Sequence, residues 1–191
     1  MAMRTLDQLD DHELMQRYGE GEVAAFEQLY QRHRQGLYRY FLRQCGQPAL
    51  AEDLYQEVWS RVIGAARRYR PDARFDTWLY RIAHNRLVDH YRRPSLVGSE
   101  PTETVEAVEP GPVEAAEQQQ QAQRLHHCLG QLPALQLEAF MLKEEVGFSA
   151  AAVAEVVGAS LEATKSRLRY AYQKLRECVT QTGEEVRDER A

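Results

Sequence analysis

Residues 147–176 have the sequence GFSAAAVAEVVGASLEATKSRLRYAYQKLR, which decides the fold of the carboxy-terminal part of the chain. The pattern predicts two helices joined by a tight turn. Gly158 can adopt the left-handed backbone that ends a helix, and Ser160 is a favourable N-cap for the next one. Ala154 is small enough for two short helices to cross closely. The second helix carries five cations, Lys165, Arg167, Arg169, Lys174 and Arg176, against one acid, Glu162.

This layout is typical of a helix-turn-helix whose second helix enters the major groove of DNA. The alternative is an ordinary helical hairpin with a solvated basic face. A turn pattern alone does not separate the two, but the excess of cations favours DNA binding. The apolar residues of the second helix that we expect to face a core are Leu161, Leu168, Ala171 and Leu175.

The composition indicates a globular protein of one or two small domains, with 191 residues of which 43% are hydrophobic. No apolar run approaches the roughly 20 residues of a membrane span, and the acidic first residues lack the apolar core of a secretory signal. We therefore expect a cytoplasmic protein without direct membrane insertion. Three widely separated cysteines, Cys45, Cys128 and Cys178, suit a reducing compartment and predict no disulfide framework.

The net charge of −5 argues against a nucleic-acid-binding protein until its distribution is considered. Residues 61–93 contain nine arginines, three acids and no lysine, and residues 160–176 contain five cations and one acid. Two basic segments separated by acidic ones differ from a uniformly acidic surface, because local charge decides contact with phosphate.

Residues 94–123 have four prolines and six glutamates, and no Lys, Arg, Asp or aromatic residue. Such a segment cannot bury a core, so we expect a flexible acidic linker, disordered to about residue 112, whose end can join the next helix. The predicted domains are therefore residues 1–93 and 124–179, followed by a charged and frayed tail at residues 180–191.

Apolar residues recur at three- and four-residue steps through the first domain, which predicts helices over residues 26–42, 50–62 and 75–91. Pro71 fixes a turn before the third helix. Leucines within residues 125–142 predict two further helices before the helix-turn-helix. Because no strand pattern or internal repeat occurs, the predicted fold class is all-α, with two small helical domains.

The segment AEDLYQEVWSRV, residues 51–62, places polar residues opposite its leucine and valine stripe. Taken alone, this acidic face is best explained as a solvated surface. It could instead dock on basic residues of a partner protein, where charge complementarity supplies steering and register. The polar residues are Glu52, Asp53, Gln56 and Glu57.

The segment RRYRPDARFDTWLYRIAHNRLVDHYRR, residues 67–93, mixes aromatic residues with arginines. Single-stranded DNA binding uses this chemistry, because cations follow the phosphates while rings stack on unpaired bases. The spacing of Phe75 and Trp78 with the apolar stripe instead favours core positions for these two. The better candidates for nucleic-acid contact lie on the other faces: Tyr80, Arg81, Asn85 and Arg86.

No enzyme signature occurs in the chain. We find no nucleophile–base pair, phosphate-binding glycine loop or metal-ligand spacing, so we expect no catalytic residue, no metal and no cofactor. The run His126, His127 and Cys128 does not share one helix face and is best explained by a structural role.

Taken together, these segments resemble the extracytoplasmic-function (ECF) sigma factors, a compact two-domain branch of the bacterial sigma-70 family. The resemblance covers residues 9–178 apart from the linker. It is carried by the order and spacing of five motifs: FEQLYQRHRQGLYRY, AEDLYQEVW, FDTWLYRIAHNRLVDHYRR, LGQLP and the helix-turn-helix that ends TKSRL.

The resemblance implies binding to core RNA polymerase. One helix would dock on the clamp helices of the largest polymerase subunit, and the carboxy-terminal domain would dock on the flap of the second-largest subunit. The acidic linker would thread toward the active centre and the RNA exit path. An anti-sigma factor would cover the binding faces. The implied clamp-binding residues are Asp53, Leu54, Gln56 and Glu57.

The resemblance also implies two DNA contacts. The loop of residues 67–74 and the following helix would read and melt the minus-10 promoter element and hold a base of the non-template strand. The residues implied there are Arg67, Arg68, Tyr69, Arg70, Arg74, Tyr80, Arg81, Asn85, Arg86, Arg92 and Arg93. The second helix of the helix-turn-helix would read the minus-35 element as duplex, through Ser160, Glu162, Ala163, Lys165, Ser166, Arg167, Arg169 and Tyr170.

The helix-turn-helix departs from the usual family pattern at several positions. Leu137, Ala151 and Ala152 stand where a charged residue is frequent, and residues 162–164 replace a commoner small–Thr–Val run. Tyr170 and Tyr172 replace frequent arginines. We expect the fold to tolerate these changes, because alanine favours helices, and the phosphate contacts of this domain to be weaker.

The sequence therefore predicts a non-enzymatic initiation factor that directs RNA polymerase to a set of promoters and helps to open them. A free-standing helix-turn-helix regulator would need a dimer interface and a palindromic site, and no heptad seam is present. A nuclease would need clustered carboxylates or metal ligands, which the sequence lacks.

Overall fold

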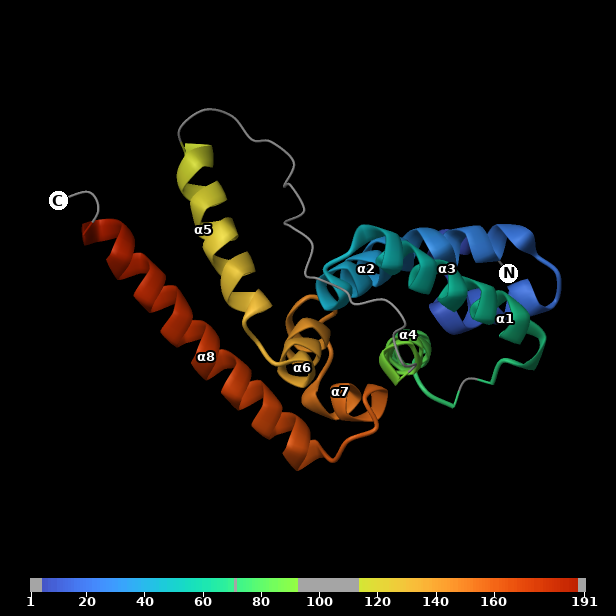
Figure 1. Cartoon of the computed structure of the whole chain (residues 1–191). Helices are drawn as coiled ribbons and strands as arrows, with labels where there is room; N and C mark the ends of the chain where they lie inside the picture. The colour runs from blue at the N-terminus through green and yellow to red at the C-terminus, as the bar shows by residue number, and fades with distance from the viewer. Residues whose placement is uncertain (1–4, 71, 93–113, 189–191) are drawn as a thin grey trace. The chain divides into compact units, whose positions relative to one another are not determined.

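The computed structural model describes residues 5–70, 72–92 and 114–188, with side chains in 120–181 of the last range. Every regular element in these residues is a helix, which confirms the all-α prediction. The chain divides into two compact units, one built from η1 to α4 and the other from α5, α6, most of α7 and α8 (Figure 1). None of the helices in these ranges has the length and apolar character needed to cross a membrane. The predicted linker lies outside the described residues as far as residue 113.

The first unit contains four α-helices and two short 3-10 helices in the described residues. Its first α-helix is fixed by a capping box, in which the Asp10 side chain accepts from Glu13 N at 2.8 Å while Glu13 accepts from Asp10 N at 3.0 Å. The elements are η1 (Leu6–Gln8), α1 (Asp11–Gly19), α2 (Val23–Cys45), α3 (Pro48–Ala65), η2 (Ala66–Arg68) and α4 (Phe75–Arg92).

Helices α2, α3 and α4 form the framework of the first unit, with α2 packed on α3 and α3 packed on α4. The turn between α2 and α3 follows from the sequence. Gly46 ends α2 with a φ of 66°, and Pro48 occupies the first turn of α3, where its missing N–H has no consequence. Side chains from all three helices fill the core, among them Leu29, Phe41, Val58, Val62, Leu79 and Ala83.

The second unit contains α5 (Glu114–Gly130), α6 (Ala134–Glu144), α7 (Ala150–Val156) and α8 (Leu161–Asp188). Helix α8 packs on both α5 and α6. It continues through Asp188, within the segment that the sequence predicts as a charged tail. Its contact with α5 buries a cluster made of Cys128, Leu129, Leu132, Ala171 and Leu175.

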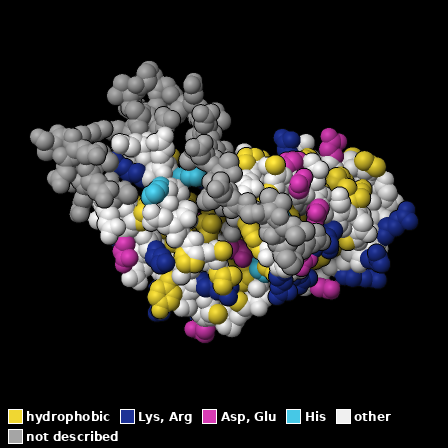
Figure 2. Space-filling model, in the orientation of Figure 1, with side chains coloured by type: hydrophobic (Ala, Val, Ile, Leu, Met, Phe, Trp, Pro, Cys, Tyr) yellow, Lys and Arg dark blue, Asp and Glu magenta, His cyan; other side chains and the backbone are white. Residues whose placement is uncertain are grey.

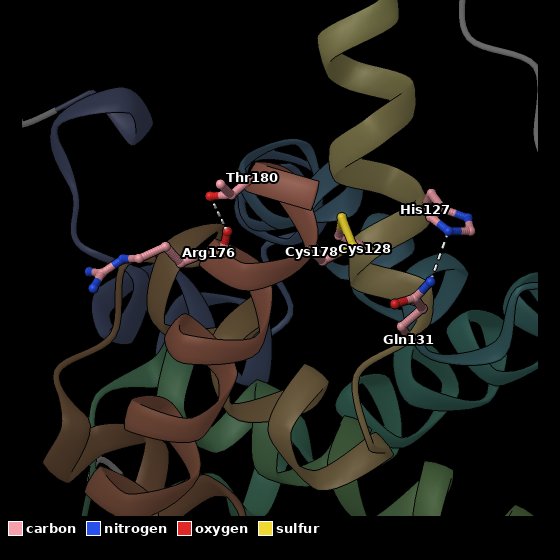
Figure 3. Close-up of a disulfide and its surroundings, with 6 residues drawn as sticks. All are labelled: His127, Cys128, Gln131, Arg176, Cys178 and Thr180. Atoms are coloured by element: carbon pink, nitrogen blue, oxygen red, sulfur yellow. Dashed lines mark hydrogen bonds between the residues drawn. A yellow bond between two sulfur atoms is a disulfide. The ribbon is translucent and has the colours of Figure 1, made fainter. Parts of the chain in front are cut away.

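A disulfide joins Cys128 of α5 to Cys178 of α8 (Figure 3), so the prediction of a chain without disulfides is wrong for this pair. The two Cα atoms lie 5.8 Å apart although 50 positions separate the residues in sequence. Packing of α8 against α5 creates this proximity, and the spacing of cysteines along the chain does not reveal it. Cys45 remains a free thiol in the first unit.

The helix-turn-helix forms as the sequence predicts. Gly158 has a φ of 61°, and the Ser160 hydroxyl accepts from Ala163 N at 3.1 Å, which caps α8. Ser149 caps α7 in the same way through Ala152 N at 3.1 Å. Leu161 is the exception among the four predicted core residues of α8, because it is 40% exposed at the first position of that helix.

Candidate nucleic-acid and protein interfaces

The acidic face of α3 is a surface feature of the first unit. Asp53, Gln56 and Glu57 are exposed, and Gln56 Nε2 donates to Glu52 Oε1 at 2.8 Å. Leu54 is 3% exposed, so it packs in the core and does not belong to the contact surface. Three of the four residues predicted to bind a partner protein are therefore presented together on one side of a rigid helix.

Arg86 of α4 reaches toward this acidic face. Its Nη1 donates to Glu57 Oε2 at 3.1 Å, and its other terminal nitrogen bonds the carboxylate of Asp89. The Arg86 side chain is only 11% exposed. The sequence placed Arg86 among the DNA contacts, whereas the structure directs it into a surface hollow. The hollow is lined by Asp53, Gln56, Glu57, Ser60, Arg61 and Arg86.

The loop before α4 presents arginines around a packed tyrosine. Arg67, Arg68, Arg70 and Arg74 are exposed, and Arg74 Nη2 lies 2.8 Å from Asp76 Oδ2. The Tyr69 ring packs 5.1 Å from Trp78 and 6.1 Å from Phe75, centroid to centroid.

Tyr69 is held in this loop by a bond to α1. Its hydroxyl and His12 Nδ1 are hydrogen-bonded, 2.5 Å apart. Burial, followed by the nearby carboxylates of Asp11 and Asp10, raises the pKa of Tyr69 to about 12. Tyr69 therefore supports the shape of the loop, and the positive charge of the loop comes from the surrounding arginines.

The predicted DNA contacts on α4 differ in exposure. Arg81, Asn85 and Arg92 are exposed. Tyr80 is 3% exposed and packs edge-on against Tyr40 with 5.5 Å between ring centroids, so its assignment to DNA contact is wrong. Of the two expected core aromatics, Phe75 is buried and Trp78 is half-buried. Arg93 lies outside the described residues.

Cations of the first unit lie among acids. In Figure 2 the visible face of this unit carries both dark blue side chains, which are all arginines here, and magenta side chains of Asp and Glu. The pairs Arg86–Glu57, Arg86–Asp89 and Arg74–Asp76 account for part of this mixing. The exposure and the ion pairs of each arginine, rather than the number of arginines, therefore decide which of them are available to DNA.

Helix α8 presents every one of its predicted DNA contacts at least partly to solvent. Ser160, Glu162, Lys165, Arg169 and Tyr170 are exposed. Lys165 Nζ lies 3.0 Å from Glu162 Oε1, and the Arg169 guanidinium lies over the Tyr170 ring at 5.2 Å. The remaining predicted contacts are half-buried: Ala163, Ser166 and Arg167.

A shallow groove along α8 contains residues that the sequence did not single out as DNA contacts. Tyr172 bonds Glu144 of α6 and packs on Phe140, with ring centroids 5.7 Å apart. Burial, with the Glu144 bond, raises the pKa of Tyr172 to about 12. The residues that line the groove recur at three- and four-residue steps, so the sequence alone could have shown that they share one side of α8. The groove is lined by Lys165, Leu168, Arg169, Tyr172, Gln173 and Arg176.

His127, next to Cys128, has a local partner. His127 in the last turn of α5 and Gln131 just after that helix are hydrogen-bonded at 2.8 Å (Figure 3). Across the residues that the structure describes, no cluster of three or more His, Cys, Asp or Glu side chains could hold a metal ion.

Comparison with protein families places two sigma-70 regions on these two units. The family model described as Sigma-70 region 2 matches residues 29–95, and that described as Sigma-70, region 4 matches residues 122–175. RNA polymerase sigma factor CarQ of Myxococcus xanthus is 32% identical over 175 residues, which cover 90% of this chain and 99% of CarQ. ECF RNA polymerase sigma factor SigK of Mycobacterium sp. (strain KMS) is 29% identical over 87% of this chain and 89% of SigK.

Solved structures share the fold. CnrH in complex with the cytosolic domain of CnrY matches 90% of this chain and 97% of that chain, with a TM-score of 0.67 and 24% identity. The sigma factor RpoE in complex with the anti-sigma factor NepR, from Bartonella quintana, matches 81% and 96%, with a TM-score of 0.68 and 22% identity. With both sigma-70 regions in order and CarQ matched over nearly its whole length, the chain belongs to the extracytoplasmic-function branch of the sigma-70 family of RNA polymerase sigma factors.

Proposed function

We propose that this sigma factor binds core RNA polymerase through the acidic face of α3 and contacts promoter DNA through α4, its preceding loop and α8. The observation that carries the proposal is that one unit presents exposed polar and acidic residues on α3 and exposed residues suited to DNA contact on α4. Asp53, Gln56 and Glu57 are exposed on α3, whereas Arg81 and Asn85 are exposed on α4. One unit can then hold a basic surface of the polymerase and the phosphates of DNA at the same time.

The minus-10 element is the proposed ligand of α4 and its loop. The exposed arginines of residues 67–74 supply phosphate contacts, and Asn85 supplies a side-chain amide for a base edge. The half-buried rings of Tyr69 and Trp78 provide an apolar floor beside the loop, against which an extruded base could stack.

The minus-35 element is the proposed ligand of α8. Its cap and its cations are arranged as in a recognition helix, with the N-terminal residues presented for base edges and Lys165 and Arg169 for bases or phosphates. Polymerase would hold the two units on one promoter, so that two weak DNA contacts act together.

The wider role follows from family membership. A sigma factor works with the polymerase, so we place this chain in the cytoplasm and assign the chemistry of RNA synthesis to the polymerase. CnrH and RpoE were solved with CnrY and with the anti-sigma factor NepR, which supports an anti-sigma factor as a partner here. The relatives are sigma factors, which does not favour the free-standing regulator.

The test is reconstitution with core RNA polymerase of the source bacterium and a genomic promoter library, with transcript starts mapped. Starts that depend on the added protein are expected, and their absence would overturn the sigma-factor role. For the docking face, the double variant Asp53→Lys, Glu57→Lys should lose polymerase binding, because it reverses two exposed charges. Wild-type affinity in this variant would refute the assignment of the face.

A further inference from the structure

We propose that Arg86 is a positioning residue for polymerase binding: it holds the Glu57 carboxylate on the acidic face of α3 and does not contact promoter DNA. The inference rests on the proposed docking role of that face. Its place in a segment rich in arginines and aromatic residues predicts DNA contact for Arg86, whereas this inference assigns it to the protein-binding face. The basis is the direction, the burial and the partners of its guanidinium.

The guanidinium of Arg86 is engaged by carboxylates at both ends. Nη1 donates to Glu57 Oε2 at 3.1 Å across the α3–α4 contact, and the other terminal nitrogen bonds Asp89 on α4. The Arg86 side chain is 11% exposed, whereas Glu57 and Asp89 are 52% and 50% exposed. A covered cation with two carboxylate partners has little left to offer a phosphate, but its planar fork can fix both partners.

Helical geometry separates Arg86 from the DNA-facing side of α4. At 3.6 residues per turn, Asn85 and Arg92 lie within about 40° of Arg81 around the helix axis, whereas Arg86 lies about 140° from Arg81. Arg81, Asn85 and Arg92 are exposed, as a contact surface requires. Arg86 therefore belongs to the side of α4 that packs on α3.

The consequence concerns Glu57. A half-exposed glutamate alone samples several rotamers, and ordering it upon binding opposes association. Arg86 removes part of that freedom beforehand and keeps the carboxylate beside Asp53 and Gln56 on the lining of the same hollow. Since Arg86 is anchored on α4, it also ties the polymerase-binding face to the helix that presents the minus-10 contacts.

The experiment is a double-mutant cycle on the full-length protein, with the Kd for core RNA polymerase as the first readout. Glu57→Gln and Arg86→Gln should each raise this Kd about 3- to 10-fold, the range for a partly exposed charge pair at an interface. The Kd of the double variant should be no more than about twofold above the higher of the two single-variant Kd values, because Arg86 acts through Glu57. Arg39→Gln, which removes an exposed arginine from α2, is the control for the change in charge.

A second readout is promoter binding by the assembled holoenzyme as a function of salt. Arg86→Gln should leave the salt slope unchanged, whereas Arg81→Gln should reduce it by about one. A variant Arg86→Gln with wild-type polymerase affinity and a reduced slope would overturn the inference and make Arg86 a DNA contact. Multiplicative effects of the two substitutions in the cycle would also overturn it, because they indicate independent structural effects.

Failure of the inference is distinguishable from failure of the proposed docking face. If Asp53→Lys, Glu57→Lys binds polymerase normally, the face itself is misassigned. If that variant fails to bind while Arg86→Gln binds normally, the face stands and the role of Arg86 is refuted. Thermal unfolding of each variant, followed by tryptophan fluorescence, identifies any loss of the fold.

Discussion

The two units stabilise and present their helices in different ways. In the first unit, aromatic rings fill the space between α2 and α3, with Trp59 packed 4.9 Å from Tyr30 and 5.8 Å from Phe26, centroid to centroid. In the second, a small cluster between α5 and α8 is supplemented by the bond from Cys128 to Cys178. The covalent link joins the same two helices as this cluster, and such a link acts mainly by constraining the unfolded chain.

The same comparison applies to the cations. Several arginines of the first unit are paired with acids of the fold, as in Arg86–Glu57 and Arg74–Asp76. Helix α8 presents Arg169 and Lys165 to solvent, and the Lys165–Glu162 pair is local to its first turns. The number of arginines in a segment is thus a poorer guide to DNA contact than their exposure and partners.

The largest expected effect comes from removing the disulfide. Cys178→Ser should lower the free energy of unfolding of the second unit by up to about 4 kcal/mol, because 50 positions separate the linked residues and the unfolded chain regains that loop entropy. Both tryptophans, Trp59 and Trp78, lie in the first unit, so fluorescence reports its unfolding while circular dichroism reports both units.

The control is Cys45→Ser, which alters a free thiol of the first unit. Compared with this control, Cys178→Ser should shift the unfolding transition followed by circular dichroism and leave the transition followed by fluorescence almost unchanged. Dithiothreitol should reproduce the effect in the wild-type protein only. Identical urea transitions for the oxidised wild type and Cys178→Ser would contradict a stabilising role for the link.

The second effect concerns DNA binding by α8. Arg169→Ala should weaken binding of the holoenzyme to the minus-35 element by about 1–3 kcal/mol, as for loss of one specific arginine contact. Lys174→Ala is the matched control, because it removes a cation from α8 about 140° around the axis. Equal losses from both variants, measured by fluorescence anisotropy, would mean that α8 binds by general charge attraction.

The third effect sharpens the view that charges of the first unit are structural. Asp11 of α1 lies 2.9 Å from Arg32 Nη1 and 2.6 Å from His33 Nε2, both on α2. Burial alone would raise the pKa of Asp11, but the bonds and charges of His33 and Arg32 outweigh it and lower the pKa below 3.8. Asp11→Asn should therefore reduce stability at pH 7 by about 1 kcal/mol.

The pH dependence of Asp11 has a definite sign. A carboxyl with a lowered pKa in the folded state stabilises fully above its unfolded pKa, and the contribution disappears as the pH falls through the folded value. The difference in urea midpoint between Asp11→Asn and the wild type should shrink as the pH falls below about 4. A difference that persists unchanged there would exclude the ionised carboxylate as its source.

The smallest effect separates two arginines of one helix. Arg81→Gln should weaken promoter binding by less than about 1 kcal/mol and reduce the dependence on salt, because it removes a single exposed cation. It should leave the Kd for core polymerase unchanged. A change in polymerase affinity as large as that of Arg86→Gln would remove the distinction between the two sides of α4.

Much of the architecture was predictable from local sequence. The apolar stripes located α2, α3, α4 and α8, and Gly158 and Ser160 located the turn of the helix-turn-helix, because these signals depend on neighbours within one or two turns. The eight predicted contacts on α8 and its N-cap are all at least partly exposed, since the amphipathic pattern distinguishes the two sides of that helix.

The failures lie where a residue depends on a distant element. Tyr80 was expected to contact DNA, but Tyr40 of α2 packs against it. Arg86 was grouped with the DNA contacts, and the sequence did not reveal that Glu57 of α3 pairs with it. An aromatic or an arginine suits a core, an ion pair or a nucleic acid equally well, so its type alone does not decide among these environments.

The sequence by itself determined the helical class, the helix-turn-helix and the family, because periodicity, capping residues and ordered motifs are properties of the linear chain. Tertiary structure alone decided that Arg86 faces Glu57, that Tyr80 is buried and that Cys128 and Cys178 are joined. The physical reason is that these three features depend on which helices pack together. The rotation of each helix against its neighbour then determines the partner of every side chain at the contact.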